Sequence, residues 1–363
     1  MPGLSSGRTW TQPVRLFFIL AALLVLGACR PAPPVVQQEA FVFGTRVEII
    51  VAGKAEAEAR AAAGAVLREF DRLHRTYHAW QPSELSTLNA ALAAGQSIDV
   101  SAELAAWLRE AQALSAAGDG LFDPGIGRLI ALWGFQSDEY KARLPDPAAL
   151  AAWRAAPAGI ADLRVDGLRI SSRSPQVAID LGGYLKGVAL DRAAEILRAH
   201  GVSDALINIG GNVMALGRKN GEPWRVGIQH PRQPGALATV ELADGEAIGT
   251  SGDYQRYFEV DGHRYSHLID PRSAEPAQHT RALTVLVPTL PGGASADAQA
   301  GMRSDALSKP LFIAGADWPA LAARLGVRHV LRVDADGRLE ISAALRDRLK
   351  FVDPPVPAPR IVP

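Results

Sequence analysis

The sequence of 363 residues has little cysteine and no net charge. Its one cysteine, Cys29, excludes an intramolecular disulfide framework and any zinc or iron–sulfur site built from several cysteines. The 38 basic and 38 acidic side chains cancel, so the composition lacks the basic excess on which nucleic-acid binding relies. Eight histidines leave other metal sites open, and a hydrophobic fraction of 48% is enough for a folded core.

The apolar run near the start is too short to cross a membrane by itself. Leu16 to Leu26 is an unbroken run of eleven apolar residues, whereas a transmembrane helix needs about 20. Arg8 and Arg15 precede it, as in a signal peptide. The run ends in Leu26-Gly27-Ala28-Cys29, which resembles the lipobox of bacterial lipoproteins. We therefore expect cleavage before a lipid-modified Cys29 that anchors the protein on the periplasmic side of a bacterial membrane; an ordinary secretory signal peptide is the alternative.

These patterns divide the chain into four parts. Residues 1–28 are the predicted lipoprotein signal peptide, and residues 29–39 are a proline-rich tether. Residues 40–352 form the predicted folded domain, and residues 353–363 a disordered tail.

Hydrophobic periodicity predicts both helices and strands, without an internal repeat and without the strict alternation of a Rossmann chain. The class is therefore α+β. The predicted helices cover 54–78, 102–116, 126–133, 147–155, 186–200, 295–314 and 318–325, and the predicted strands cover 41–51, 163–171, 177–181, 205–216, 224–229, 238–242, 257–260, 264–269 and 283–287, with a hairpin over 330–341.

Two glycine-rich segments carry a carboxylate. In residues 120–127, Asp123 lies just before a predicted helix among glycines that let a ligand approach the backbone; a simple helix N-cap is the alternative. In residues 180–187, Asp180 ends a predicted strand and Lys186 begins a helix, an arrangement that suits phosphate binding. The spacing is not that of a P-loop.

Two further segments combine other reactive groups. Residues 250–254 and 265–272 bring hydroxyls, His267 and two carboxylates onto adjacent predicted hairpins. A structural histidine is the alternative, and neither H-E-x-x-H nor a G-x-S-x-G elbow occurs in the predicted folded domain, which argues against a zinc protease or a serine hydrolase. In the helix around residues 304–309, Asp305 could hold Mg²⁺, or it could form an i,i+4 surface pair with Lys309 worth only about 0.3–0.5 kcal/mol.

Taken together, these segments resemble the ApbE family of flavin transferases from residue 43 to about residue 315. The matching stretches are Phe43-Gly44-Thr45, residues 78–85, Leu88-Asn89, residues 120–124 and 132–135, Asp180-Leu181-Gly182-Gly183, Lys186-Gly187, residues 207–212, 223–227, 250–254 and 267–272, and Asp305-Ala306-Leu307. Each stretch alone is modest, but their order along the chain makes a chance match negligible.

The resemblance implies an ApbE-like fold of mixed, mostly antiparallel sheets flanked by helices. It also implies an enzyme that cleaves FAD at its pyrophosphate and joins the FMN half to a Thr or Ser hydroxyl of a target protein, releasing AMP. The expected targets are redox-complex subunits with an Asp-Gly-x-Thr-like segment. An FAD pyrophosphatase, which uses water instead of the acceptor, and a non-catalytic FAD-binding lipoprotein are the alternatives.

The same resemblance implies the site residues. FAD contacts are expected at Phe43, Trp80 (with Tyr77 as the alternative), Leu121, Phe122, Asp123, Asp180, Lys186 and Leu268. Mg²⁺ ligands are expected at the Gly183 carbonyl, Asp305, Ser308 and the position of Lys309. His267 is expected to take the proton of the acceptor hydroxyl, because the pKa of a histidine ordinarily lies near the working pH.

This chain departs from the family pattern at Lys309, where the family has Thr, and at Pro310, where it has Ala. An ammonium cannot ligate Mg²⁺. Two interpretations follow: either Lys309 turns to solvent and the metal keeps Asp305, or Lys309 binds Asp305 and replaces part of the cation's charge. Pro310 lacks an N–H, so the Ala306 carbonyl loses its helical partner.

Overall fold

The computed structural model describes residues 35–137, 141–289, 299–353 and 358–363. The predicted signal peptide, Cys29 and the first part of the predicted tether lie outside these ranges. Within them, every helix is too short or too polar to cross a membrane.

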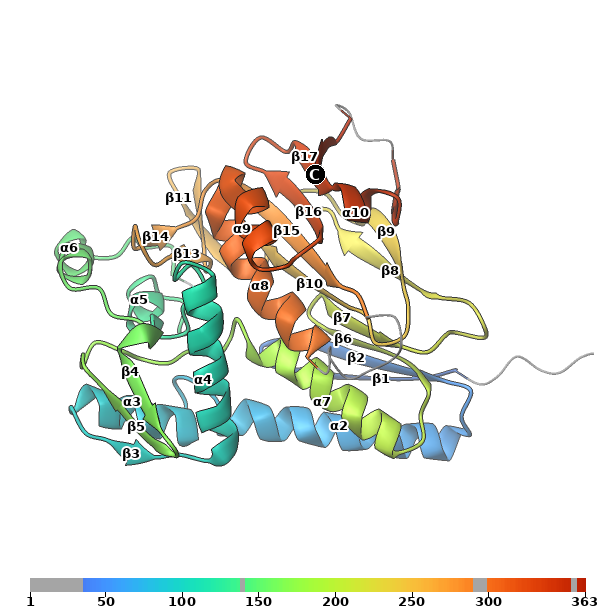
Figure 1. Ribbon diagram of the computed structural model, residues 1–363, viewed down its shortest axis with the longest axis horizontal. Coiled ribbons are helices and arrows are strands. Elements are labelled where there is room, and N and C mark those ends of the chain that lie inside the picture. The colour runs from blue at the N-terminus through green and yellow to red at the C-terminus, as the bar shows by residue number, and fades with distance from the viewer. Residues whose placement is uncertain (1–34, 138–140, 290–298, 354–357) are drawn as a thin grey trace, which may run out of the picture.

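A nine-stranded sheet forms the centre of the molecule (Figure 1). Its strands, in spatial order, are β1 (Val35–Val42), β2 (Thr45–Ala52), β6 (Asp204–Ile209), β7 (Asn212–Leu216), β10 (Ala247–Gly252), β15 (Thr280–Val287), β16 (His329–Asp334), β17 (Leu339–Ser342) and β19 (Arg360–Val362). All neighbours are antiparallel except β17 and β19, which are parallel. The predicted α+β class with mostly antiparallel sheets is confirmed.

Three long helices cover one face of this sheet: α2 (Glu56–Thr76), α7 (Leu185–Ala199) and α8 (Ala300–Ala314). The apolar residues of α2 recur every three or four positions, so that one stripe is buried and the rest is solvated. Helix α8 packs on β10 and β15, and α7 lies between α8 and α2. The short α9 (Trp318–Arg324) follows α8.

A small sheet covers the other face. It consists of β8 (Trp224–Gln229), β9 (Ala236–Leu242) and β18 (Leu349–Phe351), with α10 (Ala343–Arg346) before the last strand. Alternate residues of β8 are buried, and they join a separate apolar cluster with Ile248, Leu286 and Leu331 of the large sheet. The central strands β7, β10 and β15 are therefore buried on both faces.

The remaining elements gather where α2 ends, at the left of Figure 1. They are α3 (Glu84–Ala93), α4 (Ala102–Ala117), α5 (Gly127–Leu132), α6 (Pro147–Ala155), a sheet of β3 (Ile98–Asp99), β4 (Leu163–Asp166) and β5 (Arg169–Ser172), and the hairpins of β11 (Tyr257–Val260) with β12 (His263–Ser266) and β13 (Ile269–Asp270) with β14 (Glu275–Pro276).

Several segments predicted as single strands contain a turn or form no strand. The strand predicted over 41–51 is the β1–β2 hairpin, which turns at Phe43 and Gly44 with φ of 56° and 69°. Residues 163–171 and 205–216 are likewise hairpins, because apolar residues on both sides of a glycine turn resemble one continuous strand. Residues 177–181 form no strand; Ala178 makes an isolated parallel bridge with Ile126. The helix predicted over 295–314 begins at Ala300 among the described residues.

Strand pairing shows that the folded domain extends beyond both predicted boundaries, residues 40 and 352. Val36 lies in β1 and Val362 in β19, and both side chains are buried. Residues 35–39 are thus part of the fold and not of a tether, and residues 360–362 are not a disordered tail. Prolines flank both strands in the sequence. Each strand pairs with a partner that is distant along the chain or differs in its hydrophobic pattern, so the sequence did not predict either one.

Helices α7 and α8 are in close contact. A Cβ on Gly187 would lie 2.5 Å from the Gly301 carbonyl oxygen and 2.7 Å from Asp305 Cβ. Asp191 of α7 accepts hydrogen bonds from the Gly301 and Met302 N–H groups, each at 2.8 Å, and burial raises its pKa to about 7. These contacts fix α8, which carries Asp305.

We expect Gly187→Ala to lower the free energy of unfolding by about 1–3 kcal/mol, because the added methyl group must push α7 away from α8. Gly64→Ala is the matched control: Gly64 also lies in a helix, but a Cβ there meets the flexible Arg68 side chain at 3.5 Å. The control should raise the free energy of unfolding by roughly 0.5–1 kcal/mol. Urea denaturation measures both, and equal effects would contradict this account.

Candidate functional site

The predicted site residues come from distant segments that meet around the start of α7. The Asp180 N–H donates to the Pro124 carbonyl at 2.8 Å, which joins residues 120–127 to residues 178–183. Gly183 packs against the Lys309 side chain of α8. His267, which follows β12, is close enough to Lys186 and Lys309 for both cations to shift its pKa. The structure therefore brings residues 120–127, 180–187 and 304–309 together with His267, which belongs to the remaining predicted segment.

Asp305 is fully buried and paired with a side chain of its own helix. Its Oδ1 forms an ion pair with Lys309 Nζ, and its Oδ2 accepts the Gly187 N–H at 2.9 Å. Lys309 Nζ also donates to the Asp305 carbonyl at 2.8 Å. Burial alone would raise the pKa of Asp305, but Lys309 and Lys186 hold it below its usual value. This is the second of the two interpretations of Lys309, and not a surface ion pair.

The groups around Asp305 do not fit a divalent cation, which requires several oxygen ligands. The neighbours of the carboxylate are donors: Lys309 Nζ, the Gly187 N–H and Asn212 Nδ2, which is buried, lacks a hydrogen-bond partner among the described residues, and helps to lower the pKa of Asp305. Ser308, predicted as a ligand, donates to the Asp305 carbonyl at 2.7 Å and contacts Ser251 Oγ at 2.8 Å.

The same conclusion holds for other groups of possible metal ligands. Within the described ranges, no group of three or more His, Cys, Asp or Glu side chains is arranged to hold a metal ion. Gly183, another predicted ligand, packs against the Lys309 stem, and the ammonium of that side chain would repel a cation bound nearby.

Asp180 is held by backbone contacts that the sequence motif did not explain. Asn89 of α3 binds both the N–H and the carbonyl of Ile179, at 2.6 and 2.9 Å. Asp180 accepts the Gly182 N–H at 2.8 Å, and burial raises its pKa, opposed by Arg256 and His78. Asn89 therefore positions the loop from which Asp180 and Lys186 project.

Asp123 has a structural role in its segment. Its Oδ1 accepts N–H groups from Gly125 at 2.7 Å and from Ile160 at 2.8 Å, and burial raises its pKa to about 6. The alternative of a helix N-cap is wrong, because Ile126 is the N-cap of α5. The side chains of Leu121, Phe122 and Leu268 are buried in the main core.

A chain of four rings lies beside the β1–β2 turn. Phe43 contacts His74 with ring centroids 5.8 Å apart, His74 contacts His78 at 5.0 Å, and His78 contacts Trp80 at 4.6 Å. Phe43 and Trp80 are both half-buried and present flat apolar faces. Tyr77, the alternative to Trp80, is instead buried and donates to Glu103 at 2.6 Å. The i,i+4 spacing of His74 and His78 was the signal that sequence reasoning missed.

His267 is positioned by backbone and aromatic contacts. Its Nδ1 is 3.1 Å from the Arg256 carbonyl oxygen, and its ring lies 6.3 Å from that of Phe135. Burial, Arg256 and Lys186 lower its pKa to about 3, so the expectation of a pKa near neutrality is wrong. Nδ1 carries the proton that faces the carbonyl, and Nε2 is left as an acceptor.

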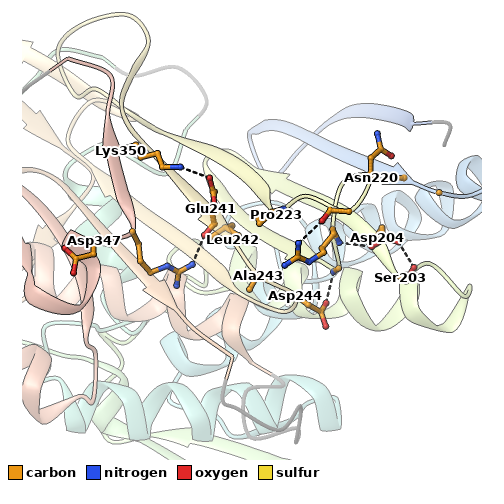
Figure 2. Close-up of a pocket in the computed structure, with 16 residues that line it drawn as sticks. Ser203, Asp204, Asn220, Pro223, Glu241, Leu242, Ala243, Asp244, Asp347 and Lys350 are labelled. Atoms are coloured by element: carbon orange, nitrogen blue, oxygen red, sulfur yellow. Dashed lines mark hydrogen bonds and ion pairs between the residues drawn. The ribbon is translucent and has the colours of Figure 1, made fainter. Parts of the chain in front are cut away.

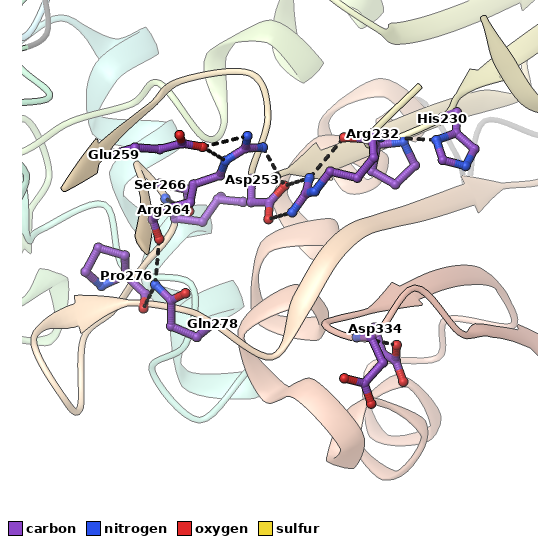
Figure 3. A network of polar contacts seen from close by, with 12 residues as sticks. His230, Arg232, Asp253, Glu259, Arg264, Ser266, Pro276, Gln278 and Asp334 are labelled. Atoms are coloured by element: carbon purple, nitrogen blue, oxygen red, sulfur yellow. Dashed lines mark hydrogen bonds and ion pairs between the residues drawn. The ribbon is translucent and has the colours of Figure 1, made fainter. Parts of the chain in front are cut away.

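The two carboxylates near His267 bind arginines. Asp253 accepts two hydrogen bonds from Arg232, at 2.7 and 2.6 Å (Figure 3). The neighbouring Arg264 donates to Glu259. Asp270 pairs with Arg272 at 2.8 Å. These carboxylates are therefore neutralised by arginine, and they do not orient His267 as in a Ser-His-Asp triad.

A large cavity lies elsewhere in the described part of the molecule. It measures about 1080 Å³ and is lined by residues of the β6–β9 region and of the segment near β18, among them Asp204, Glu241 and Lys350 (Figure 2). Lys350 pairs with Glu241 at 2.8 Å, and Arg218 N donates to Asp204 at 2.7 Å. None of the predicted site residues lines it. Chemistry, and not cavity size, places the candidate site at Asp305.

Comparisons with known proteins identify the family. The family model "ApbE family" matches residues 43–331. An FAD:protein FMN transferase of Rhodobacter capsulatus is 40% identical over 94% of this chain, which spans 64% of that protein's length. One from Haemophilus influenzae is 32% identical over 74% of this chain and 77% of its own length.

A solved structure extends the similarity to three dimensions. The ApbE protein of Thermotoga maritima superposes with a TM-score of 0.77 at 30% identity, covering 87% of this chain and 99% of its own. Sequence, fold and the grouping of residues around Asp305 lead to one conclusion: the chain belongs to the ApbE family.

Proposed function

We propose that this chain transfers the FMN moiety of FAD to a Thr or Ser hydroxyl of a target protein through a phosphoester bond, releasing AMP. The relatives from Rhodobacter capsulatus and Haemophilus influenzae are named FAD:protein FMN transferases. The observation that carries the proposal is the cluster of Lys186, Lys309 and neutral His267 beside the start of α7. Cations and helix N-termini bind phosphate, and the neutral imidazole supplies a proton acceptor.

The reaction balances with groups present in the chain. The acceptor oxygen bonds to the phosphorus of the FMN half, and the bond from that phosphorus to the bridging oxygen breaks. AMP leaves with the bridging oxygen and its electron pair. The hydroxyl proton passes to His267 Nε2, whose affinity for a proton rises beside the bound diphosphate, and then to solvent. Catalysis of this kind depends on positioning and charge stabilisation.

The proposal also names where the flavin ring binds and which kind of protein accepts the FMN. Phe43 and Trp80 offer flat faces on which an isoalloxazine ring can stack. The acceptor is a redox-complex subunit with an Asp-Gly-x-Thr-like segment. Incubating the protein with FAD and such a peptide should give a flavin-fluorescent peptide and an equal amount of AMP. FMN and AMP without labelled peptide would instead indicate a pyrophosphatase, and unchanged bound FAD a binding protein.

We expect His267→Ala to lower the transfer rate by about 10²–10⁴-fold, the range for loss of a general base. FAD affinity, measured by flavin fluorescence, should change little. Asn89→Ala is a comparison variant that acts through the position of Asp180, and it should weaken FAD binding as well as the rate.

The pKa of about 3 has a consequence for pH dependence. His267 stays neutral from about pH 5 to 8, so kcat/KM for FAD should show no acid limb near pH 6.5. An acid limb there that disappears in His267→Ala would contradict the assignment.

We further propose that the chain is exported and lipid-anchored through Cys29 on the periplasmic side of the membrane. In a Gram-negative host, wild-type protein should fractionate with membranes, and mass spectrometry of its N-terminal peptide should find acyl chains. Cys29→Ser should release the protein. Equal membrane association of both forms would contradict the proposal.

A further inference from the structure

The Asp305–Lys309 pair differs from an ordinary i,i+4 pair in its burial. The Asp305 side chain is fully buried, and that of Lys309 is 14% exposed. An isolated buried carboxylate is strongly unfavourable, so the pair must be retained once the site forms. Gly183 packs on the Lys309 stem, where a Cβ would lie 3.3 Å from Cε.

Lys309 keeps capacity for one more partner. An ammonium has three N–H donors. One contacts Asp305 Oδ1 and one donates to the Asp305 carbonyl, which leaves one for an incoming oxygen. The Lys309 side chain keeps 14% exposure, and Gly183, which precedes α7, packs on its stem, so the remaining donor is available beside the proposed diphosphate site.

The other groups at Asp305 supply few of the oxygen ligands that a divalent cation requires. The Gly187 N–H and Asn212 Nδ2 are donors, and Ser308 Oγ is already bonded to Asp305 O and Ser251. A divalent cation at Asp305 would therefore displace Lys309 and leave a buried ammonium next to it, a like-charge contact that costs free energy.

We propose that Lys309 supplies, from within the chain, the positive charge that would otherwise come from a divalent cation, so that flavin transfer by this protein needs no divalent metal. This inference rests on the proposed function. Lys309 donates to a nonbridging phosphate oxygen of FAD, and Asp305 holds the ammonium in place. The bonds formed and broken are those given above, and no further reactant is required.

The test compares transfer rates in EDTA and in Mg²⁺. The wild-type rate should be the same in both within about twofold. Lys309→Gln, which keeps a donor toward Asp305 without the charge, should lose about 10²–10³-fold in both, as for loss of one transition-state donor. Lys309→Thr should be equally slow in EDTA and recover in Mg²⁺. Lys219→Thr, an exposed lysine far from the site, should behave as the wild type. A wild-type rate abolished by EDTA and restored by Mg²⁺ would overturn the inference.

A second measurement does not depend on turnover. Mn²⁺ binding followed by electron paramagnetic resonance should be absent in the wild type and present in Lys309→Thr, and Asp305→Asn should remove it again. Circular dichroism checks that each variant folds. Mn²⁺ bound by the wild type and lost in Asp305→Asn would overturn the inference even if no variant transfers flavin. Absent transfer with this binding pattern intact would instead count against the proposed function alone.

Discussion

Burial of the Asp305 carboxylate is the constraint on which the site depends. A buried carboxylate requires partners, and here they come from its own helix and from the start of α7, through Lys309 and Gly187. The contact with Gly187 requires α7 and α8 to approach so closely that neither Gly187 nor Gly301 tolerates a side chain. The same close contact therefore serves both packing and electrostatics. Gly187 and Gly301 let the two helices approach, and the Gly187 N–H binds Asp305.

The central sheet makes this arrangement rigid. Helix α8 packs on β10 and β15, which are themselves covered on their other face by the small sheet of β8, β9 and β18. The loops that carry Phe43, Asp180 and His267 then project from fixed elements. A flavin transferase that works by positioning needs such a support more than it needs mobile reactive groups.

Much of this could be predicted from the sequence, because the signals are local. Helical periodicity identified α2, α4 and α7, and the resemblance to the ApbE family grouped Asp180, Lys186 and Asp305 in one expected site. The hairpin turns at Phe43 and at Gly210-Gly211 were missed, since strand alternation continues across a two-residue turn. Strands β1 and β19 were missed because pairing with a partner strand, and not their own composition, makes them strands.

Other properties of the site depend on neighbours that no sequence pattern names. The pKa of His267 falls to about 3 because three cations and the core surround it. Asn89 and His78 act through contacts with residues about a hundred positions away. The choice between the two interpretations of Lys309 likewise required the position of its ammonium, which binds Asp305.

The most direct measurement is a crystal structure of the protein with FAD and Mn²⁺, with anomalous diffraction used to locate manganese. The account predicts Lys309 Nζ between Asp305 and a phosphate oxygen, with no anomalous peak at Asp305. A manganese peak bound to Asp305, with Lys309 turned to solvent, would contradict it.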